Sequence, residues 1–238
     1  MNHCPAIVAH RGFSARFREN SAAAWLGAIA AHADIIEIDL RATADLEIVC
    51  AHDATLERLS GHRQEIAAIA ASALDAIRIA GEPVAPRLSQ VFKTIPPTTG
   101  LLFDIKDERI AVLNAILGAL SSYDDHDITL GLHTVESIAF CRKAGWAGGV
   151  LALLGDMSTK EAAFAAGSNI LRVWESDASD DYIAQCLELG PVWVTVGEHD
   201  TGRKVGDFAA ADLVRMARAG VSGFLVNDPE AARAVLAR

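Results

Sequence analysis

Two carboxylates stand two positions apart inside an apolar stretch of the chain. The stretch is 35–40, Ile-Ile-Glu-Ile-Asp-Leu, and the acids are Glu37 and Asp39. Its branched aliphatic residues predict a buried strand, in which both acids point to the same face. Two like charges on an apolar strand are costly unless a cation lies between them, and a divalent metal ion is one such cation. A salt-bridged pair or two solvent-facing acids at a strand end are the alternatives.

Further residues of types that can catalyse reactions or bind ligands fall at the ends of other predicted strands. His10 and Arg11 end the first strand, His52 follows a return strand over 46–51, and Asp104 and Lys106 end the strand 101–106. Several carboxylate ligands suit Mg²⁺ or Ca²⁺, and two imidazoles suit proton transfer near neutral pH. Arginine and lysine suit an anionic group such as a phosphate. Together these types indicate metal-assisted hydrolysis of a phosphate ester; for Lys106, a plain ion pair with Asp104 is the alternative.

These residues would meet if the strands closed into a barrel. Strand–helix alternation predicts eight units in 238 residues, which is typical of a TIM barrel, whose active site lies at the carboxyl ends of the strands. An open doubly wound sheet is the alternative. The predicted strands are Ala6–His10, Ile35–Leu40, Leu101–Lys106, Ile128–Leu132, Gly149–Leu154, Asn169–Trp174, Val192–Val196 and Gly223–Asn227.

Residues 53–97 interrupt the alternation. They contain four prolines and a helical pattern over Glu65–Arg78. We expect an insertion on a single domain that spans residues 1–238. Helices are also expected over Ala22–Ala31, with Asn20 or Ser21 as the cap, and over Pro229–Ala237.

The composition narrows the class of partner. A net charge of −10 argues against nucleic acid or an anionic membrane surface. The four cysteines show no metal-type or disulfide-type spacing and are expected to be free thiols. No signal peptide or membrane-spanning run is apparent, so the expected protein is soluble and cytoplasmic, with a small-molecule substrate. The oligomeric state is not predicted.

An ordered set of short motifs resembles the glycerophosphodiester phosphodiesterase family. The set is His10-Arg11-Gly12, Glu19-Asn20-Ser21, Glu37-Ile38-Asp39 and His52-Asp53, and the match continues with Asp104-Ile105-Lys106 and Asn227-Asp228-Pro229. The resemblance therefore spans nearly the full chain, and the order of the motifs makes it specific.

The resemblance implies a TIM barrel with an insertion after its second strand. It also implies metal-dependent cleavage of a glycerophosphodiester to glycerol 3-phosphate and an alcohol, with one divalent cation, Mg²⁺ or Ca²⁺. The implied roles are catalysis for His10 and His52, phosphate binding for Arg11 and Lys106, and metal ligation for Glu37, Asp39 and Asp104.

Two other activities fit the same residues. One is a transesterase similar to sphingomyelinase D, which would release a cyclic phosphate. The other is a non-catalytic barrel that binds a phosphorylated ligand, although this chain retains every histidine and carboxylate of the pattern. Which histidine is the acid is left open.

Some positions depart from the family pattern or have a structural explanation. The third metal carboxylate of the family is usually Glu, and here it is Asp104. Glu19 is expected to partner Arg11 or to support the site from outside. His133, Trp174 and His199 fall at strand ends, where ordinary rim residues are also found.

Overall fold

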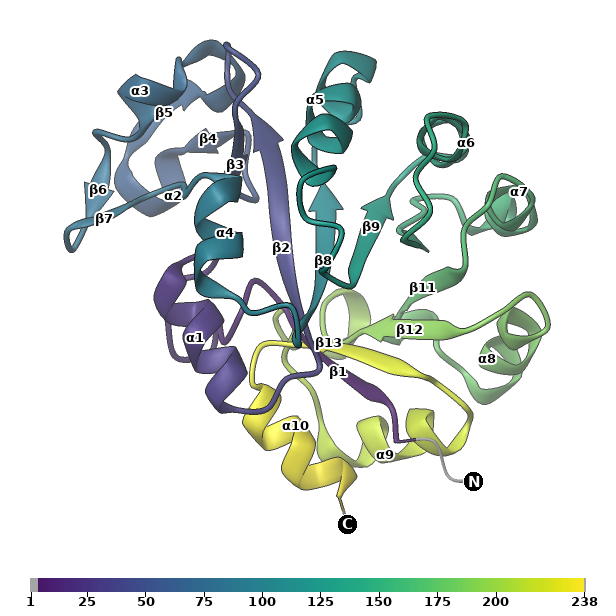
Figure 1. Ribbon diagram of the computed structural model, residues 1–238. Helices are drawn as coiled ribbons and strands as arrows, with labels where there is room; N and C mark the ends of the chain where they lie inside the picture. Colours follow the sequence, from purple (N-terminus) through teal and green to yellow (C-terminus); the bar gives the residue numbers. More distant parts are fainter. Residues whose placement is uncertain (1–3, 238) are drawn as a thin grey trace.

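Eight parallel strands close into a barrel in the computed structural model, which describes residues 4–237 apart from the side chain of His199 (Figure 1). The ring closes where β1 pairs with β2, with Val8 opposite Ile35. This confirms the TIM barrel and excludes the open sheet. The barrel strands are β1 (Ala6–Ala9), β2 (Ile35–Ala42), β8 (Gly100–Ile105), β9 (Ile128–Leu132), β10 (Gly149–Ala152), β11 (Ile170–Trp174), β12 (Val192–Thr195) and β13 (Gly223–Val226).

Helices follow the strands and cover the outside of the barrel (Figure 1). Ser21 caps the first of them by accepting a hydrogen bond from the backbone N–H of Ala24. The helices are α1 (Ala22–Ala30), α4 (Leu88–Thr94), α5 (Ile110–Leu120), α6 (Val135–Lys143), α7 (Lys160–Ala165), α8 (Asp180–Leu187), α9 (Ala210–Arg218) and α10 (Pro229–Leu236), with short 3-10 helices η2 (Met157–Thr159), η3 (Glu175–Asp177) and η4 (His199–Thr201). Within residues 4–237, no helix has the length and apolar character needed to cross a membrane.

Alternate residues of each strand face different cores. In β2, Ile36 and Ile38 pack in the layer between strands and helices, whereas Ile35 packs against the cluster inside the barrel. That inner cluster comprises Val8, Leu102, Leu151, Leu153, Trp193 and Leu225. Because side chains alternate along a strand, Glu37 and Asp39 share the inner face with Ile35, towards the carboxyl end of the barrel.

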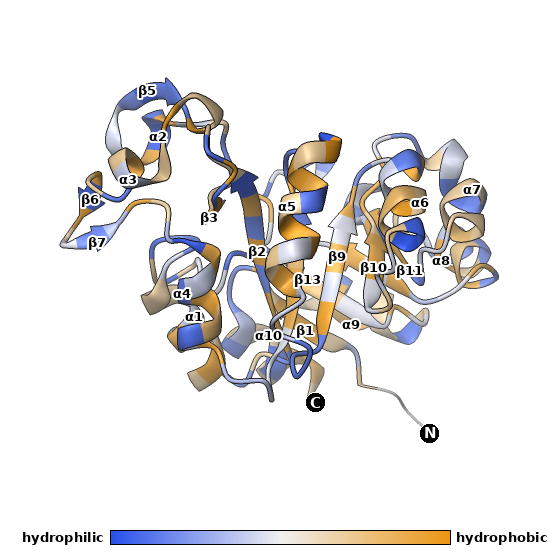
Figure 2. Cartoon of the chain, turned by 45° about the horizontal axis from the view of Figure 1, so that its top comes forward, coloured by the Kyte–Doolittle hydropathy of each residue, from blue (hydrophilic) through white to orange (hydrophobic). Residues whose placement is uncertain are grey.

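A group of short elements leaves the barrel after β2 and gathers at one side of it (Figure 1). β3 pairs antiparallel with the end of β2, with Cys50 opposite Leu40. The group has its own small apolar core, whereas its strand β5 is wholly exposed and hydrophilic (Figure 2). Its elements are β3 (Ile48–Cys50), β4 (Thr55–Leu56), α2 (Glu57–Ser60), β5 (His62–Glu65), η1 (Ile66–Ala68), α3 (Ala71–Leu74), β6 (Arg78–Ile79) and β7 (Glu82–Pro83).

The prediction of a helix over Glu65–Arg78 is wrong. The segment is divided among β5, η1, α3 and β6. Hydrogen bonds from outside the segment interrupt the helix, because Ala44 N–H donates to Ile69 O and Asp45 Oδ1 accepts from Ala71 N–H, both at 2.9 Å. The helix that follows, α4, contacts α1 and so belongs to the outer helical layer. We therefore propose one domain with an insertion over residues 43–87, between the end of β2 and the start of α4, which begins and ends earlier than the predicted 53–97.

Candidate active site

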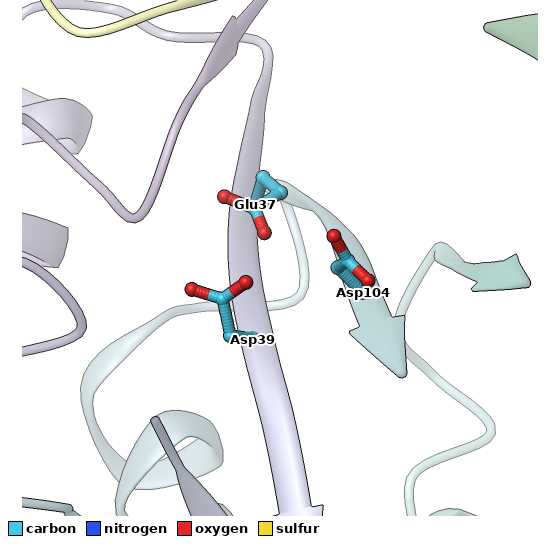
Figure 3. A group of neighbouring side chains, drawn as sticks. All are labelled: Glu37, Asp39 and Asp104. Carbon is cyan, nitrogen blue, oxygen red and sulfur yellow. The ribbon is translucent and has the colours of Figure 1, made fainter. Parts of the chain in front are cut away.

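Three carboxylates meet at the carboxyl end of two neighbouring strands (Figure 3). Glu37 and Asp39 come from β2 and Asp104 comes from β8, where it lies opposite Asp39 in the strand register. One oxygen of each lies within 4.8 Å of the others, and Glu37 and Asp39 are 1% exposed. This convergence is the one that the strand-end argument predicts.

The cluster carries more negative charge than its neighbours neutralise. Burial, together with Asp39 and Asp104, raises the pKa of Glu37 well above its usual value. Glu37 Oε1 and Asp39 Oδ1 are enclosed and have no hydrogen-bond partner. Buried carboxylate oxygens without partners are rare and costly. The donor set, with two oxygens that accept no hydrogen bond from the described residues, therefore fits a hard divalent cation.

Two cationic side chains border the carboxylates. Lys106 Nζ lies 2.5 Å from Asp104 Oδ2 and 3.1 Å from Asp39 Oδ1, and the second contact lacks hydrogen-bond geometry. Arg11 Nε lies 3.2 Å from Asp39 Oδ2. Burial opposes the charge of Lys106, but Asp104 and Asp39 outweigh it and raise its pKa. The ion pair of Lys106 with Asp104 is thus present, and it leaves Glu37 unneutralised.

The turn after β1 places Arg11 by its backbone as well as by its side chain. Arg11 has φ +57° and donates its backbone N–H to Glu37 Oε2 at 2.6 Å. Gly12 follows with φ +81°, and a Cβ there would lie 2.7 Å from the backbone of Ala24. Only glycine fits this position without displacing α1.

His10 is partly buried and is oriented by an amide. Its Nδ1 lies 2.9 Å from Asn227 Oδ1, while Asn227 Nδ2 donates to Val205 O and Asp207 Oδ1. Because both amide hydrogens are used, the oxygen must face the ring, so Nδ1–H donates and Nε2 keeps its lone pair. Burial and the charge of Arg11 lower the pKa of His10 to about 4. Its ring is therefore neutral near pH 7.

His52 is half-buried and has a carboxylate partner. Its Nδ1 lies 2.7 Å from Asp53 Oδ1, and Asp53 Oδ2 accepts from Arg58 Nε at 2.6 Å. Arg58 also donates to both oxygens of Glu19, which in turn pairs with Arg11 at 3.2 Å. A continuous chain of charged contacts thus joins the segment of His52 to the turn of Arg11.

Three residues that contact the site were not among the predicted site residues. Asn20 donates to Asp39 Oδ2 at 2.8 Å, His133 Nε2 lies 2.8 Å from Asp104 Oδ1, and Asn227 holds His10. Burial opposes ionisation of Asp104, but His133 and Lys106 outweigh it and lower its pKa. Asn20 and Asn227 belong to the motifs Glu19-Asn20-Ser21 and Asn227-Asp228-Pro229, and these motifs are the sequence feature that could have identified them.

The remaining rim residues have varied surroundings. Glu175 Oε2 accepts from the backbone N–H of Gly197 at 2.6 Å and Oε1 pairs with Arg203, so it fixes the loop after β12. Asp228 caps α10. Trp174 stacks on a buried arginine of its own strand. The side chain of His199 lies outside the described part of the chain.

Comparison with known proteins identifies a family model and relatives that the chain resembles. The model of the glycerophosphoryl diester phosphodiesterase family matches residues 10–126. A glycerophosphodiester phosphodiesterase of Caldanaerobacter subterraneus subsp. tengcongensis is 26% identical over 94% of each chain. Residues 10–126 contain every predicted site residue, from His10 to Lys106.

Solved structures share the fold at low identity. The crystal structure of glycerophosphodiester phosphodiesterase from Thermotoga maritima has a TM-score of 0.77 and 18% identity, covering 97% of this chain and 98% of that one. A phosphodiesterase of Oleispira antarctica, in complex with the product sn-glycerol-3-phosphate, has a TM-score of 0.82 and 17% identity, covering 99% and 98%. With the motif order, the barrel and the full-length relative in agreement, the chain belongs to the glycerophosphoryl diester phosphodiesterase family.

Proposed function

We propose that the chain hydrolyses a glycerophosphodiester to glycerol 3-phosphate and an alcohol, assisted by one divalent cation, Mg²⁺ or Ca²⁺. The observation that carries this proposal is the cluster of Glu37, Asp39 and Asp104, in which two buried oxygens accept no hydrogen bond from the described residues and which Arg11 and Lys106 border. Family membership supports the reaction class. The product bound to the Oleispira antarctica phosphodiesterase supports the glycerol phosphate half of the substrate.

The carboxylates would hold the cation, and the cationic side chains would hold the phosphate. A bound cation supplies charge that stabilises the phosphoryl oxygens as negative charge builds on them. Arg11 and Lys106 donate to the same oxygens and orient the group. Glu19 and Arg58 support Arg11 and the segment of His52 from outside.

The two histidines would divide the proton transfers. His10, neutral and with Nε2 free, takes a proton from water as the water oxygen bonds to phosphorus. His52 gives a proton to the alcohol oxygen as its bond to phosphorus breaks. Asp53 lies on the other nitrogen of that ring and is a partner of opposite charge whenever His52 is protonated. One water is consumed in this step. His10 ends it with an added proton and His52 with one fewer, and exchange with solvent restores both rings.

The test is an assay of glycerophosphodiesters with choline, ethanolamine, glycerol and inositol arms, each with Mg²⁺, Ca²⁺, Mn²⁺ or EDTA. Phosphorus NMR identifies the product. We expect glycerol 3-phosphate with a metal ion and none in EDTA, and activity should return when the ion is restored. A cyclic phosphate product would instead establish the transesterase, and binding without turnover would establish the non-catalytic barrel. Full activity after dialysis into EDTA would remove the metal from the proposal.

A cytoplasmic location is a separate expectation. It rests on three buried cysteines that are free thiols, Cys50, Cys141 and Cys186. Cell fractionation with an antibody to the chain tests it.

A further inference from the structure

An arginine on the inner face of the barrel is not used by the proposed reaction. Arg172 lies in the middle of β11 and is 6% exposed. Its neighbours Leu171 and Val173 pack in the outer layer, whereas Ile170 packs against the inner cluster. Alternation along the strand therefore directs the Arg172 side chain into the barrel, on the same side as the metal carboxylates.

The guanidinium of Arg172 has few partners for a buried charge. Within the described chain, no carboxylate oxygen forms an ion pair with it, and its one hydrogen bond is a long one of 3.5 Å from Nη2 to Leu153 O. Arg142, on the outside of the barrel, shows the contrast by donating to three carbonyl oxygens and to the Asn169 side chain. Buried arginines are normally paired, so Arg172 presents unused donors.

Those donors face the mouth of the barrel. No nitrogen of Arg172 is both fully enclosed and without a hydrogen-bond partner. Its N–H groups that make no hydrogen bond therefore keep contact with solvent. Asp104 is the carboxylate with the largest electrostatic effect on Arg172, ahead of Asp177 and Glu198. β8 and β11 are separated by β9 and β10 in the sheet. Arg172 therefore faces the chamber of the metal carboxylates from another side of the barrel.

The surroundings of Arg172 leave its guanidinium charged and cover one face of it. Burial lowers its pKa to about 10, which still leaves the guanidinium protonated at neutral pH. The ring of Trp174 lies 4.2 Å from the guanidinium carbon. Stacking on an aromatic ring covers one face of a guanidinium and leaves its edge free for forked hydrogen bonds to a carboxylate or phosphate.

We propose that Arg172, backed by Trp174, is a specificity subsite for a second negative charge on the substrate, a carboxylate or phosphate monoester on the arm attached to the reacting phosphate. The inference rests on the proposed phosphodiesterase function and adds a substrate class to it. Arg11 and Lys106 serve the reacting phosphate, and Arg172 serves the anionic end of the arm. An unpaired buried cation gains most from such a partner because the anion completes its hydrogen bonds.

A matched set of substrates tests the proposal. Glycerophosphoglycerol has a neutral arm; in glycerophosphoglycerate a carboxylate replaces the terminal hydroxymethyl, and in glycerophosphoglycerol phosphate a phosphate is added to it. We expect the wild-type protein to prefer one of the charged arms by about 10- to 100-fold in kcat/KM. That ratio should collapse towards one in Arg172→Gln and be kept in part by Arg172→Lys. Which charged arm gives the larger ratio separates carboxylate from phosphate recognition.

A control variant and a binding experiment keep the outcomes distinct. Arg63→Gln removes the same charge at a side chain that is 84% exposed on the insertion, and it should keep the ratio. Thermal unfolding of each variant checks that it is folded. Calorimetry in the presence of Mg²⁺ compares glycerol 3-phosphate with 3-phosphoglycerate, and the carboxylate should strengthen binding about tenfold or more in the wild type and not in Arg172→Gln.

These results separate two failures. If the wild-type protein cleaves none of the diesters, the proposed function fails, and calorimetry alone still decides the role of Arg172. If it cleaves them without a charge preference, or if Arg172→Gln keeps the preference and the binding difference, the subsite is overturned while the phosphodiesterase stands.

Discussion

The hydrogen-bond partners of His10 and His52 distinguish two rings that the sequence left equivalent. His10 faces a neutral amide and His52 faces a carboxylate, and both side chains are partly buried. A neutral ring with a free Nε2 suits a base, and a ring with an anionic partner suits an acid. These surroundings support the proposed assignment of base to His10 and acid to His52.

The leaving group tests that assignment. We expect His10→Ala and His52→Ala each to lower kcat by ~10²–10⁴-fold on an alkyl diester. On a p-nitrophenyl diester, whose leaving group needs no proton, His52→Ala should recover most of its rate and His10→Ala should not. Metal affinity, measured by calorimetry, should persist in both. Recovery by His10→Ala alone would reverse the two roles.

Glu37 gives a prediction about pH and stability in the absence of metal. Its raised folded-state pKa means that the folded protein holds a proton that the unfolded chain releases near the usual value for Glu. At this group the folded state therefore binds more protons, so the contribution of Glu37 to the stability of the metal-free protein is greatest below the unfolded-state pKa and falls as pH rises towards the folded-state value.

Glu37→Gln should remove that dependence while keeping an acceptor for the Arg11 N–H. At pH 7 in EDTA, relief of ~1–2 kcal/mol of charge burial should raise Tm by ~2–8 °C. Differential scanning calorimetry from pH 5 to 8 measures both effects. Parallel Tm–pH curves for the two proteins would contradict the prediction.

At the scale of elements, the charged chain from His52 to Arg11 ties the insertion to the barrel. Arg58 of α2 donates to Asp53 and to both oxygens of Glu19. We expect Arg58→Met to lower kcat/KM by ~10–100-fold, as for other residues that orient catalytic groups, with metal affinity unchanged. Arg63→Met is the matched control, because the ion-pair partner of Arg63 among residues 4–237 is Glu57, on the same insertion. Equal losses in both variants would mean that the insertion as a whole, and not this link, affects activity.

The elements also show where sequence reasoning succeeded and where it failed. Strand ends could be predicted because apolar runs mark the strands and a closed barrel brings their carboxyl ends together. The prediction of a helix over 65–78 failed because a hydrogen bond from Ala44 and another to Asp45 determine the conformation of that segment. The periodicity of residues within the segment carries no information about contacts with residues so far away in the sequence. The contact of Asn227 with His10 and the proposed role of Arg172 could not be predicted for a related reason. Their roles depend on which side chains other strands bring to them.

At the scale of the whole molecule, the cluster of Glu37, Asp39 and Asp104 joins two neighbouring strands of the closed ring. Asp39 and Asp104 are opposite each other in the pairing of β2 with β8. Without a cation, their repulsion and that of Glu37 act directly across this pair of strands. A cation that binds only the folded barrel stabilises all of it, since the unfolded chain does not gather the three carboxylates.

We therefore expect Mg²⁺ or Ca²⁺ at 100 times its dissociation constant to stabilise the protein by ~2.7 kcal/mol, which corresponds to a rise in Tm of ~5–10 °C for a chain of this length. Asp39→Asn should abolish the rise, because it removes a ligand. Glu65→Gln, which removes one charge from the exposed strand β5, should keep it. This control matters because a net charge of −10 attracts divalent ions to the surface in general. Calorimetric scans at constant ionic strength measure the three proteins. An equal rise in Tm for Asp39→Asn and the wild type would show that the ion stabilises the molecule from somewhere other than this cluster.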